Sequence, residues 1–142
     1  HGNNFLLTML SLHLNKDIIR VVSDQIGAVT SSSSLAKACW QAIKNFSNDK
    51  FHQNNNPILH FTDIGETSWY EVALEIGKNA LNYGLISKCA QIEPVMTYEY
   101  KTFAKRPKYS VLDCTQTYQL LNLKPVHWRN SIEDIMKKIK ED

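Results

Sequence analysis

The chain has 142 residues, of which 43% are hydrophobic and 21% are charged, so it is long enough for one domain with its own core. Its formal net charge of +2 is too small to favour nucleic acid or a membrane surface as the main partner, and no apolar run reaches the roughly 18 residues of a membrane span. The cysteines Cys39, Cys89 and Cys114 lack C-x-x-C spacing, which favours free thiols in a cytoplasmic protein over a disulfide or metal framework.

The N-terminal part predicts two helices around one strand. Asn3 or Asn4 can cap a first helix that ends near residue 14. The β-branched run at residues 18–22 predicts a strand, followed by a turn at residues 24–27 in which Gly27 is free to take a positive φ. A second helix is predicted at residues 35–46, with Ser33 or Ser34 as its cap. Its apolar face would consist of Leu35, Cys39, Ala42, Ile43 and Phe46.

The middle of the chain predicts a polar loop, a strand and a helix. Residues 45–57 are rich in Asn, Asp and Gln, and His52 has no second ligand at a suitable spacing for a metal. Residues 58–61 predict a short buried strand that contains His60. A helix follows, which opens with a capping box of Ser68 and Glu71 and ends at residues 82–84. Its predicted inner face consists of Trp69, Val72, Ala73, Ile76 and Ala80, and packing is favoured for Trp69 over a place beside a ligand.

The C-terminal part adds a strand and two helices. Residues 91–95 predict a strand in which Pro94 favours a sheet edge or a strand end. A short helix is predicted from Asp113 or Thr115 to residue 121, and a last helix at residues 128–139. The alternation of helices and strands predicts a mixed α/β fold.

A basic stretch at residues 97–113 stands out from this pattern. Lys101, Lys105, Arg106 and Lys108 place four cations within eight residues. Because Arg106 precedes a proline, its backbone is expected to be extended and its side chain to project from a loop. A guanidinium held there can make a bidentate contact with a phosphate. On charge alone, a solvated basic loop is the alternative.

This stretch also resembles a known family. Ala-Lys-Arg-Pro at 104–107, followed by Tyr-Ser-Val-Leu-Asp at 109–113, resembles the Ala-Arg-Arg-Pro…Ser-x-Leu-Asp segment of dTDP-4-dehydrorhamnose reductases. These enzymes are extended short-chain dehydrogenase/reductases that reduce a nucleotide-linked keto-sugar with a nicotinamide cofactor. Further resembling blocks follow in the order of the family: Gly2-Asn3-Asn4-Phe5, Thr8-Met9-Leu10, Val21-Val22-x-Asp24-Gln25-x-Gly27, Thr67-Ser68-Trp69-Tyr70-Glu71 and Trp128-Arg129.

The resemblance implies a fold and a binding site. The chain would be the C-terminal part of an extended Rossmann-type reductase, including its small substrate-binding lobe, and its ligand would be a dTDP-sugar nucleotide. Arg106, backed by Lys105, would hold the pyrophosphate, while Asn4 and Gln25 would supply hydrogen bonds. For Asn4, capping alone is the alternative, because asparagine is a preferred cap whatever the function.

Two motifs that the reductase chemistry needs are absent from the sequence. The five glycines never form a glycine-rich dinucleotide fingerprint, and no tyrosine is followed four residues later by lysine. The chain also begins with His1. We therefore expect a single domain, residues 1–142, without the N-terminal half that would bind NADPH or NADH. The isolated chain would hold no catalytic residue and would be inactive; the sequence leaves a homodimer open.

Two other functions compete with this interpretation. The regulatory subunit of methionine adenosyltransferase resembles the same reductases, including an Asp-Gln turn and an Arg-Pro loop, yet acts as a binding partner. An RNA-binding module would use the cations of residues 101–108 with nearby aromatic side chains as stacking platforms. It would need a broader basic surface than a net charge of +2 provides.

Overall fold

The computed structural model describes residues 4–46, 58–100 and 102–141, so the predictions for Asn3, His52 and Lys101 fall outside it. Helices and strands alternate, and the predicted mixed α/β class is confirmed. The elements are α1 (Phe5–Asn15), β1 (Ile18–Val22), β2 (Ile26–Gly27), α2 (Ser32–Phe46), β3 (Thr67–Ser68), α3 (Trp69–Asn82), β4 (Gln91–Val95), the 3-10 helix η1 (Thr97–Glu99), α4 (Thr115–Leu120) and α5 (Trp128–Glu141).

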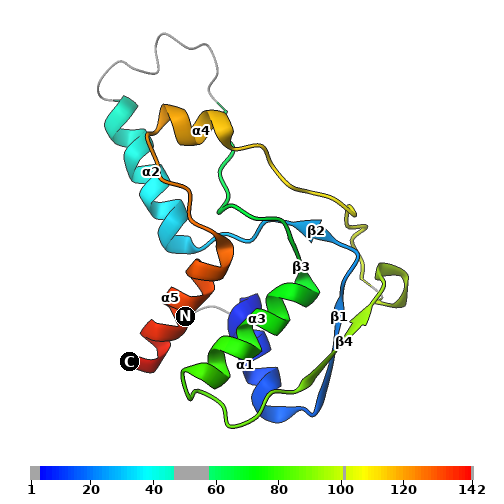
Figure 1. Ribbon diagram of the computed structural model, residues 1–142. Coiled ribbons are helices and arrows are strands. Elements are labelled where there is room, and N and C mark those ends of the chain that lie inside the picture. Colours follow the sequence, from blue (N-terminus) through cyan, green and yellow to red (C-terminus); the bar gives the residue numbers. More distant parts are fainter. Residues whose placement is uncertain (1–3, 47–57, 101, 142) are drawn as a thin grey trace.

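Two short sheets organise the chain (Figure 1). In the first, β1 and β4 pair in parallel, from Ile18 opposite Gln91 to Val22 opposite Val95. Both strands agree with the sequence prediction. Parallel strands need a crossover, and here the crossover contains β2, α2, β3 and α3. In the second sheet, β2 and β3 pair antiparallel, with Ile26 opposite Ser68 and Gly27 opposite Thr67.

Helix α3 lies at the centre of the core. It packs against β1, β4, α1 and α5. The predicted inner face is confirmed for four positions, because Val72, Ala73, Ile76 and Ala80 are buried, whereas Trp69 is 40% exposed. The core cluster further contains Met9 from α1, Ile19 and Val21 from β1, Ile86 and Ala90 before β4, Ile92 from β4, and Trp128, Ile132 and Met136 from α5.

Side-chain caps fix where the central helices begin. Asn4 Oδ1 accepts a hydrogen bond from Leu7 N at 2.9 Å, so the predicted cap of α1 is confirmed. The capping box of α3 is present in both directions: Ser68 Oγ accepts from Glu71 N at 3.1 Å, and Glu71 Oε2 accepts from Ser68 N at 2.8 Å. These bonds satisfy backbone donors that have no partner inside the helix.

Helix α2 differs from its prediction at its start and on its buried face. It begins at Ser32, and its cap is Ser31, whose Oγ accepts from Ser34 N at 3.0 Å. The predicted apolar face is wrong, because Leu35, Cys39 and Ile43 are exposed while Ala38 and Asn45 are buried. Asn45 Nδ2 donates to the Leu120 carbonyl at 3.1 Å, so a polar contact to the end of α4 orients this helix. The side chain of Phe46 lies outside the description.

Two further local predictions are wrong. Residues 58–61 form no strand, and His60 is exposed. The first β-bridge in this segment comes later, between Ile64 and His127. Gly27, predicted in a turn, lies in β2 and does not use the positive φ open to it; among the described glycines, Gly65 and Gly84 have a positive φ. A Cβ atom on Gly27 would lie 3.0 Å from Ser110 Oγ, so glycine here permits close approach of the later chain.

The contact between α1 and α3 depends on a glycine. His13 is 1% exposed and its Nε2 lies 3.2 Å from the Ala73 carbonyl oxygen. A Cβ atom on Gly77 would lie 2.5 Å from His13 Cε1. Gly77→Ala is therefore expected to lower the free energy of unfolding by about 1–2 kcal/mol, because overpacking outweighs the gain in helix propensity.

Urea denaturation followed by circular dichroism measures this effect. Lys78→Ala, at the exposed neighbouring position of α3, serves as the control and should change the free energy of unfolding by no more than about 0.5 kcal/mol. A Gly77→Ala protein as stable as the wild type would show that His13 can move aside without loss.

Candidate functional site

A cavity of about 490 Å³ opens where three parts of the chain meet. One part is the segment after β1, the second is the start of α3, and the third is the end of the basic stretch. The lining residues are Gln25, Ile26, Gly27, Ala28, Val29, Thr67, Ser68, Trp69, Arg106, Pro107 and Ser110. A space of this size is typical of a small-molecule site.

The first wall is fixed by hydrogen bonds between the turn after β1 and η1. Asp24 Oδ1 accepts from Thr97 Oγ1 at 2.6 Å and from Thr97 N at 2.8 Å. These bonds, the one from the hydroxyl above all, hold the pKa of Asp24 below its usual value. Gln25 Nε2 donates to Thr97 Oγ1 at 3.1 Å, which fixes the amide of Gln25 beside the cavity.

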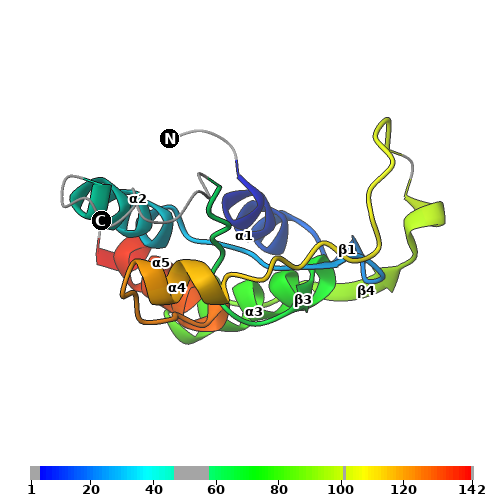
Figure 2. The ribbon, with the colours of Figure 1, turned by 90° about the horizontal axis from the view of Figure 1, so that it is seen from above.

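The basic stretch is anchored again where it returns to the cavity. Ile26 N donates to the Lys108 carbonyl at 2.8 Å, and Ser110 N donates to the Ile26 carbonyl at 2.9 Å, which makes a parallel bridge to β2. Tyr109 hydroxyl donates to Glu66 Oε1 at 2.7 Å, and this bond raises the pKa of Tyr109. All described residues from 102 to 110 are exposed. Figure 2 shows the yellow segment after η1 projecting from the body of the molecule.

The start of α3 supplies the opposite wall. Thr67 and Ser68 are buried by the pairing of β3 with β2, and Trp69 follows as the first residue of the helix. The Trp69 ring packs against Phe5 of α1, with 4.7 Å between the ring centroids and 50° between the planes. This wall therefore combines a capped helix end with an aromatic side chain.

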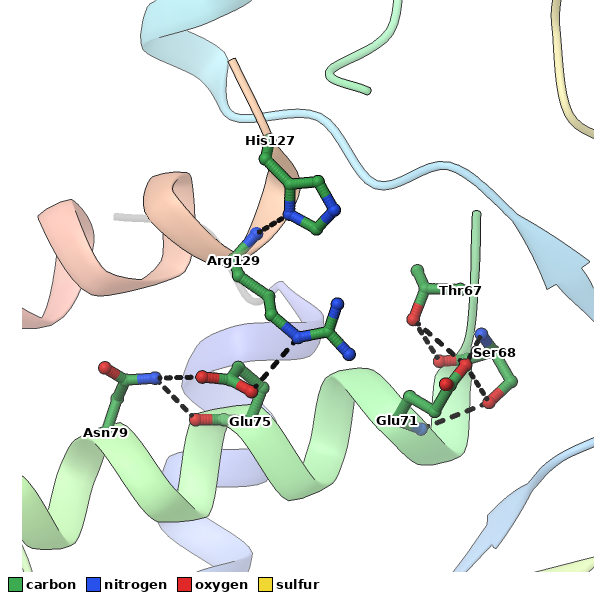
Figure 3. A network of polar contacts seen from close by, with 7 residues as sticks. All are labelled: Thr67, Ser68, Glu71, Glu75, Asn79, His127 and Arg129. Carbon is green, nitrogen blue, oxygen red and sulfur yellow. Dashed lines mark hydrogen bonds and ion pairs between the residues drawn. The ribbon is translucent and has the colours of Figure 1, made fainter. Parts of the chain in front are cut away.

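Polar contacts follow α3 from its start at Ser68 and Glu71 to Glu75 and Asn79 (Figure 3). Arg129 Nε lies 3.4 Å from Glu75 Oε2, and Glu75 Oε1 accepts from Asn79 Nδ2 at 2.9 Å. The pKa of Glu71 is lowered, first by the bond from Ser68 N and further by the Ser68 and Thr67 hydroxyls and the charge of Arg129. The start of α5 is thus linked through α3 to the residues that border the cavity.

The structure brings two of the four predicted site residues together. Gln25 and Arg106 both line the cavity although they lie far apart in the sequence. Lys105 is exposed next to Arg106 and does not line the cavity. Asn4 caps α1 and also lies outside the lining, but it directly precedes Phe5, which contacts Trp69.

Trp69 lines the cavity, whereas its sequence pattern favours packing in the core. Its spacing to Val72, Ala73, Ile76 and Ala80 matches one buried helix face, so periodicity predicts a core position. The helix face continues beyond the end of the core, however, and Trp69 lies where α3 meets the cavity. No local signal in the sequence separates these two situations.

The described part of the chain has neither a membrane-spanning helix nor a metal-binding cluster. None of its helices is both long and apolar enough to cross a membrane. Within residues 4–46, 58–100 and 102–141 no three His, Cys, Asp or Glu side chains gather into a group that could hold a metal ion.

The fold is that of a mixed α/β domain, with an open cavity between β2, the start of α3 and the basic stretch. The RmlD substrate binding domain model matches residues 1–141. The chain belongs to this family, and the predicted resemblance to dTDP-4-dehydrorhamnose reductases is confirmed.

Known relatives share this sequence pattern. The dTDP-4-dehydrorhamnose reductase of Aggregatibacter actinomycetemcomitans is 34% identical over 135 residues, which are 95% of this chain and 45% of that protein. The spore coat polysaccharide biosynthesis protein SpsK of Bacillus subtilis (strain 168) is 36% identical over 137 residues, 96% of this chain and 42% of that protein. The chain thus spans less than half the length of these relatives.

Solved structures agree with the fold. A dTDP-4-dehydrorhamnose reductase from Clostridium acetobutylicum ATCC 824 superimposes with a TM-score of 0.78 at 31% identity, over 98% of this chain and 45% of that one. The dTDP-4-dehydrorhamnose reductase of Bacillus anthracis str. Ames, in complex with NADP, superimposes with a TM-score of 0.67 at 29% identity, over 97% of this chain and 44% of that one. The chain therefore has the fold of part of a Rossmann-like extended reductase.

Proposed function

We propose that this chain is the sugar-nucleotide-binding part of a dTDP-4-dehydrorhamnose reductase, which reduces dTDP-4-keto-rhamnose to dTDP-rhamnose. The observation that carries the proposal is the meeting of Arg106 and Gln25 in one cavity of about 490 Å³. Both belong to the blocks that resemble the reductases. The names of the relatives support the same reaction.

Each predicted residue has a specific task in this proposal. Arg106 pairs with the pyrophosphate, because a guanidinium matches phosphate oxygens in a bidentate geometry. Lys105 adds positive charge at the mouth of the cavity. Gln25 already donates to Thr97, so its amide oxygen accepts from the ligand. Asn4 uses its oxygen for the cap of α1, so its amide nitrogen donates at the margin beside Phe5 and Trp69.

The chemistry itself belongs to a second half of the enzyme, which would precede this chain. That half would hold NADPH or NADH on a glycine-rich turn and would supply the tyrosine that donates the proton. The relative from Bacillus anthracis contains NADP. In the described part of this chain β1 pairs only with β4, which leaves an outer edge on each strand for other chain segments. We expect the 142 residues alone to give no turnover of dTDP-4-keto-rhamnose.

Replacing Arg106 tests the binding role. Arg106 is exposed before the ligand binds, so one charge-assisted contact is expected to be worth about tenfold in Kd. Isothermal titration calorimetry of the wild type and Arg106→Ala with dTDP should show this loss.

Lys108→Ala is the matched control for Arg106→Ala. Lys108 lies in the same stretch but does not line the cavity, so its loss should change Kd less than threefold. Equal losses in the two variants would mean that the stretch attracts the anion only through its overall charge. Detectable reduction of the keto-sugar by the 142 residues alone would contradict the expected inactivity.

A further inference from the structure

The hydroxyl of Thr97 lies between two polar side chains at the edge of the cavity. Its Oγ1 is 2.6 Å from Asp24 Oδ1 and 3.1 Å from Gln25 Nε2. The backbone N of Thr97 donates to the same Asp24 oxygen at 2.8 Å. All three residues are partly buried. A carboxylate, a hydroxyl and an amide thus form one hydrogen-bonded row that ends at the cavity.

The direction of each bond in this row follows from the chemistry of its members. Asp24 is ionised at neutral pH, and the bond from the Thr97 hydroxyl lowers its pKa further, so its oxygens only accept. A hydroxyl has a single proton, and Thr97 gives this proton to Asp24. The Thr97 oxygen is therefore left to accept, and Gln25 must turn its amide NH₂ group toward it.

This direction decides what Gln25 offers to a ligand. Its amide nitrogen is engaged by Thr97, and its amide oxygen remains as the acceptor in the cavity that it lines. Arg106 lines the same cavity and can only donate. Phosphate oxygens suit Arg106, whereas the amide oxygen of Gln25 needs an N–H or O–H group.

We propose that Thr97, oriented by Asp24, is a positioning residue that fixes Gln25 as a hydrogen-bond acceptor in the cavity. The inference rests on the proposed function and adds a specificity-determining residue that is not itself part of the cavity lining. Without the Thr97 hydroxyl, the amide of Gln25 could turn either end toward the ligand. Binding would then have to order it first, which costs affinity.

The experiment is a double-mutant cycle that measures Kd for dTDP-rhamnose by isothermal titration calorimetry. Thr97→Val keeps the shape and removes the hydroxyl, and it is expected to weaken binding about fivefold. Thr97→Ser restores a hydroxyl and should stay within about twofold of the wild type. In the Gln25→Ala background, Thr97→Val should change Kd less than about twofold, because the side chain through which it acts is gone.

A second cycle with Arg106→Ala is the matched control. The effects of Thr97→Val and Arg106→Ala should multiply, because the two residues act on different parts of the ligand. Coupling to Arg106 in place of Gln25 would show that Thr97 acts by holding the basic stretch, and the inference would be wrong while the proposed function stands. It is equally wrong if Thr97→Val binds as the wild type does, or if Thr97→Ser binds as weakly as Thr97→Val.

Two further results are decisive. A wild type that does not bind dTDP-rhamnose shows that the proposed site is wrong, and the inference is rejected with it. Circular dichroism confirms that each variant is folded. Should Thr97→Val fail to fold, Asp24→Ala takes its place in both cycles with the same expected results, because it releases the hydroxyl proton of Thr97 and so the orientation of Gln25.

Discussion

Trp128→Ala is expected to lower the free energy of unfolding by about 3–5 kcal/mol, which is the usual cost of removing a large aromatic side chain from a core. Trp128 is 0% exposed and belongs to the central core cluster. The Arg129 guanidinium lies 4.2 Å from the centroid of its ring, and the His127 ring is stacked at 5.8 Å. The substitution therefore removes both buried area and the aromatic contact that orients the start of α5.

Urea denaturation followed by far-ultraviolet circular dichroism measures this loss without depending on tryptophan fluorescence. Trp128→Phe is the control. It keeps most of the ring and removes the buried Nε1, which has no hydrogen-bond partner among the described residues, so its cost should stay below that of alanine. An alanine variant that loses less than about 1 kcal/mol would contradict the central place of α5 in the core.

Asp63→Ala is expected to have the second-largest effect, a loss of about 2–4 kcal/mol in the free energy of unfolding. The Asp63 side chain is 1% exposed. Its Oδ2 accepts from Ser131 Oγ at 2.7 Å and from Ser31 N at 3.1 Å, so it joins the start of α2 to α5. Without the carboxylate both donors would be left in the interior without an acceptor, which costs more than the bonds themselves contribute.

Two milder variants test this explanation of Asp63. Ser131→Ala removes one of the two donors and should cost about 1 kcal/mol. Asp63→Asn keeps an acceptor oxygen for both donors and should cost less than Asp63→Ala. The same denaturation experiment ranks the three proteins. If alanine is tolerated as well as asparagine at position 63, the link between α2 and α5 does not contribute to stability.

Local patterns predicted the elements whose burial depends on their own sequence. The β-branched run of β1 predicted the strand, and the apolar periodicity of α3 predicted four of its buried residues, though not the exposure of Trp69. The capping box of Ser68 and Glu71 marked the start of α3 because its bonds lie within one turn. In α2 the same reasoning failed, because contacts with other parts of the chain, such as the bond from Asn45 to the Leu120 carbonyl, decide which of its side chains are buried.

The site was predicted only in part for a related reason. Family resemblance indicated Arg106 and Gln25, and the cavity contains both. The basic stretch reaches the cavity through the bridge between Ile26 and Tyr109 and the hydrogen bond from Ser110 to Ile26. Ser110 and Ile26 lie 84 positions apart in the sequence. No local pattern encodes such pairing, so the place of Trp69 at the cavity, and the place of Lys105 outside its lining, follow only from the fold.

Titration of the wild-type chain with dTDP-rhamnose tests the central claim most directly, because the claim is that these 142 residues carry the sugar-nucleotide site. We expect saturable binding to one site per chain that is weakened about tenfold by Arg106→Ala. A folded wild-type chain that shows no binding of dTDP-rhamnose would contradict the claim, and the cavity between Gln25, Trp69 and Arg106 would then not be a site in its own right.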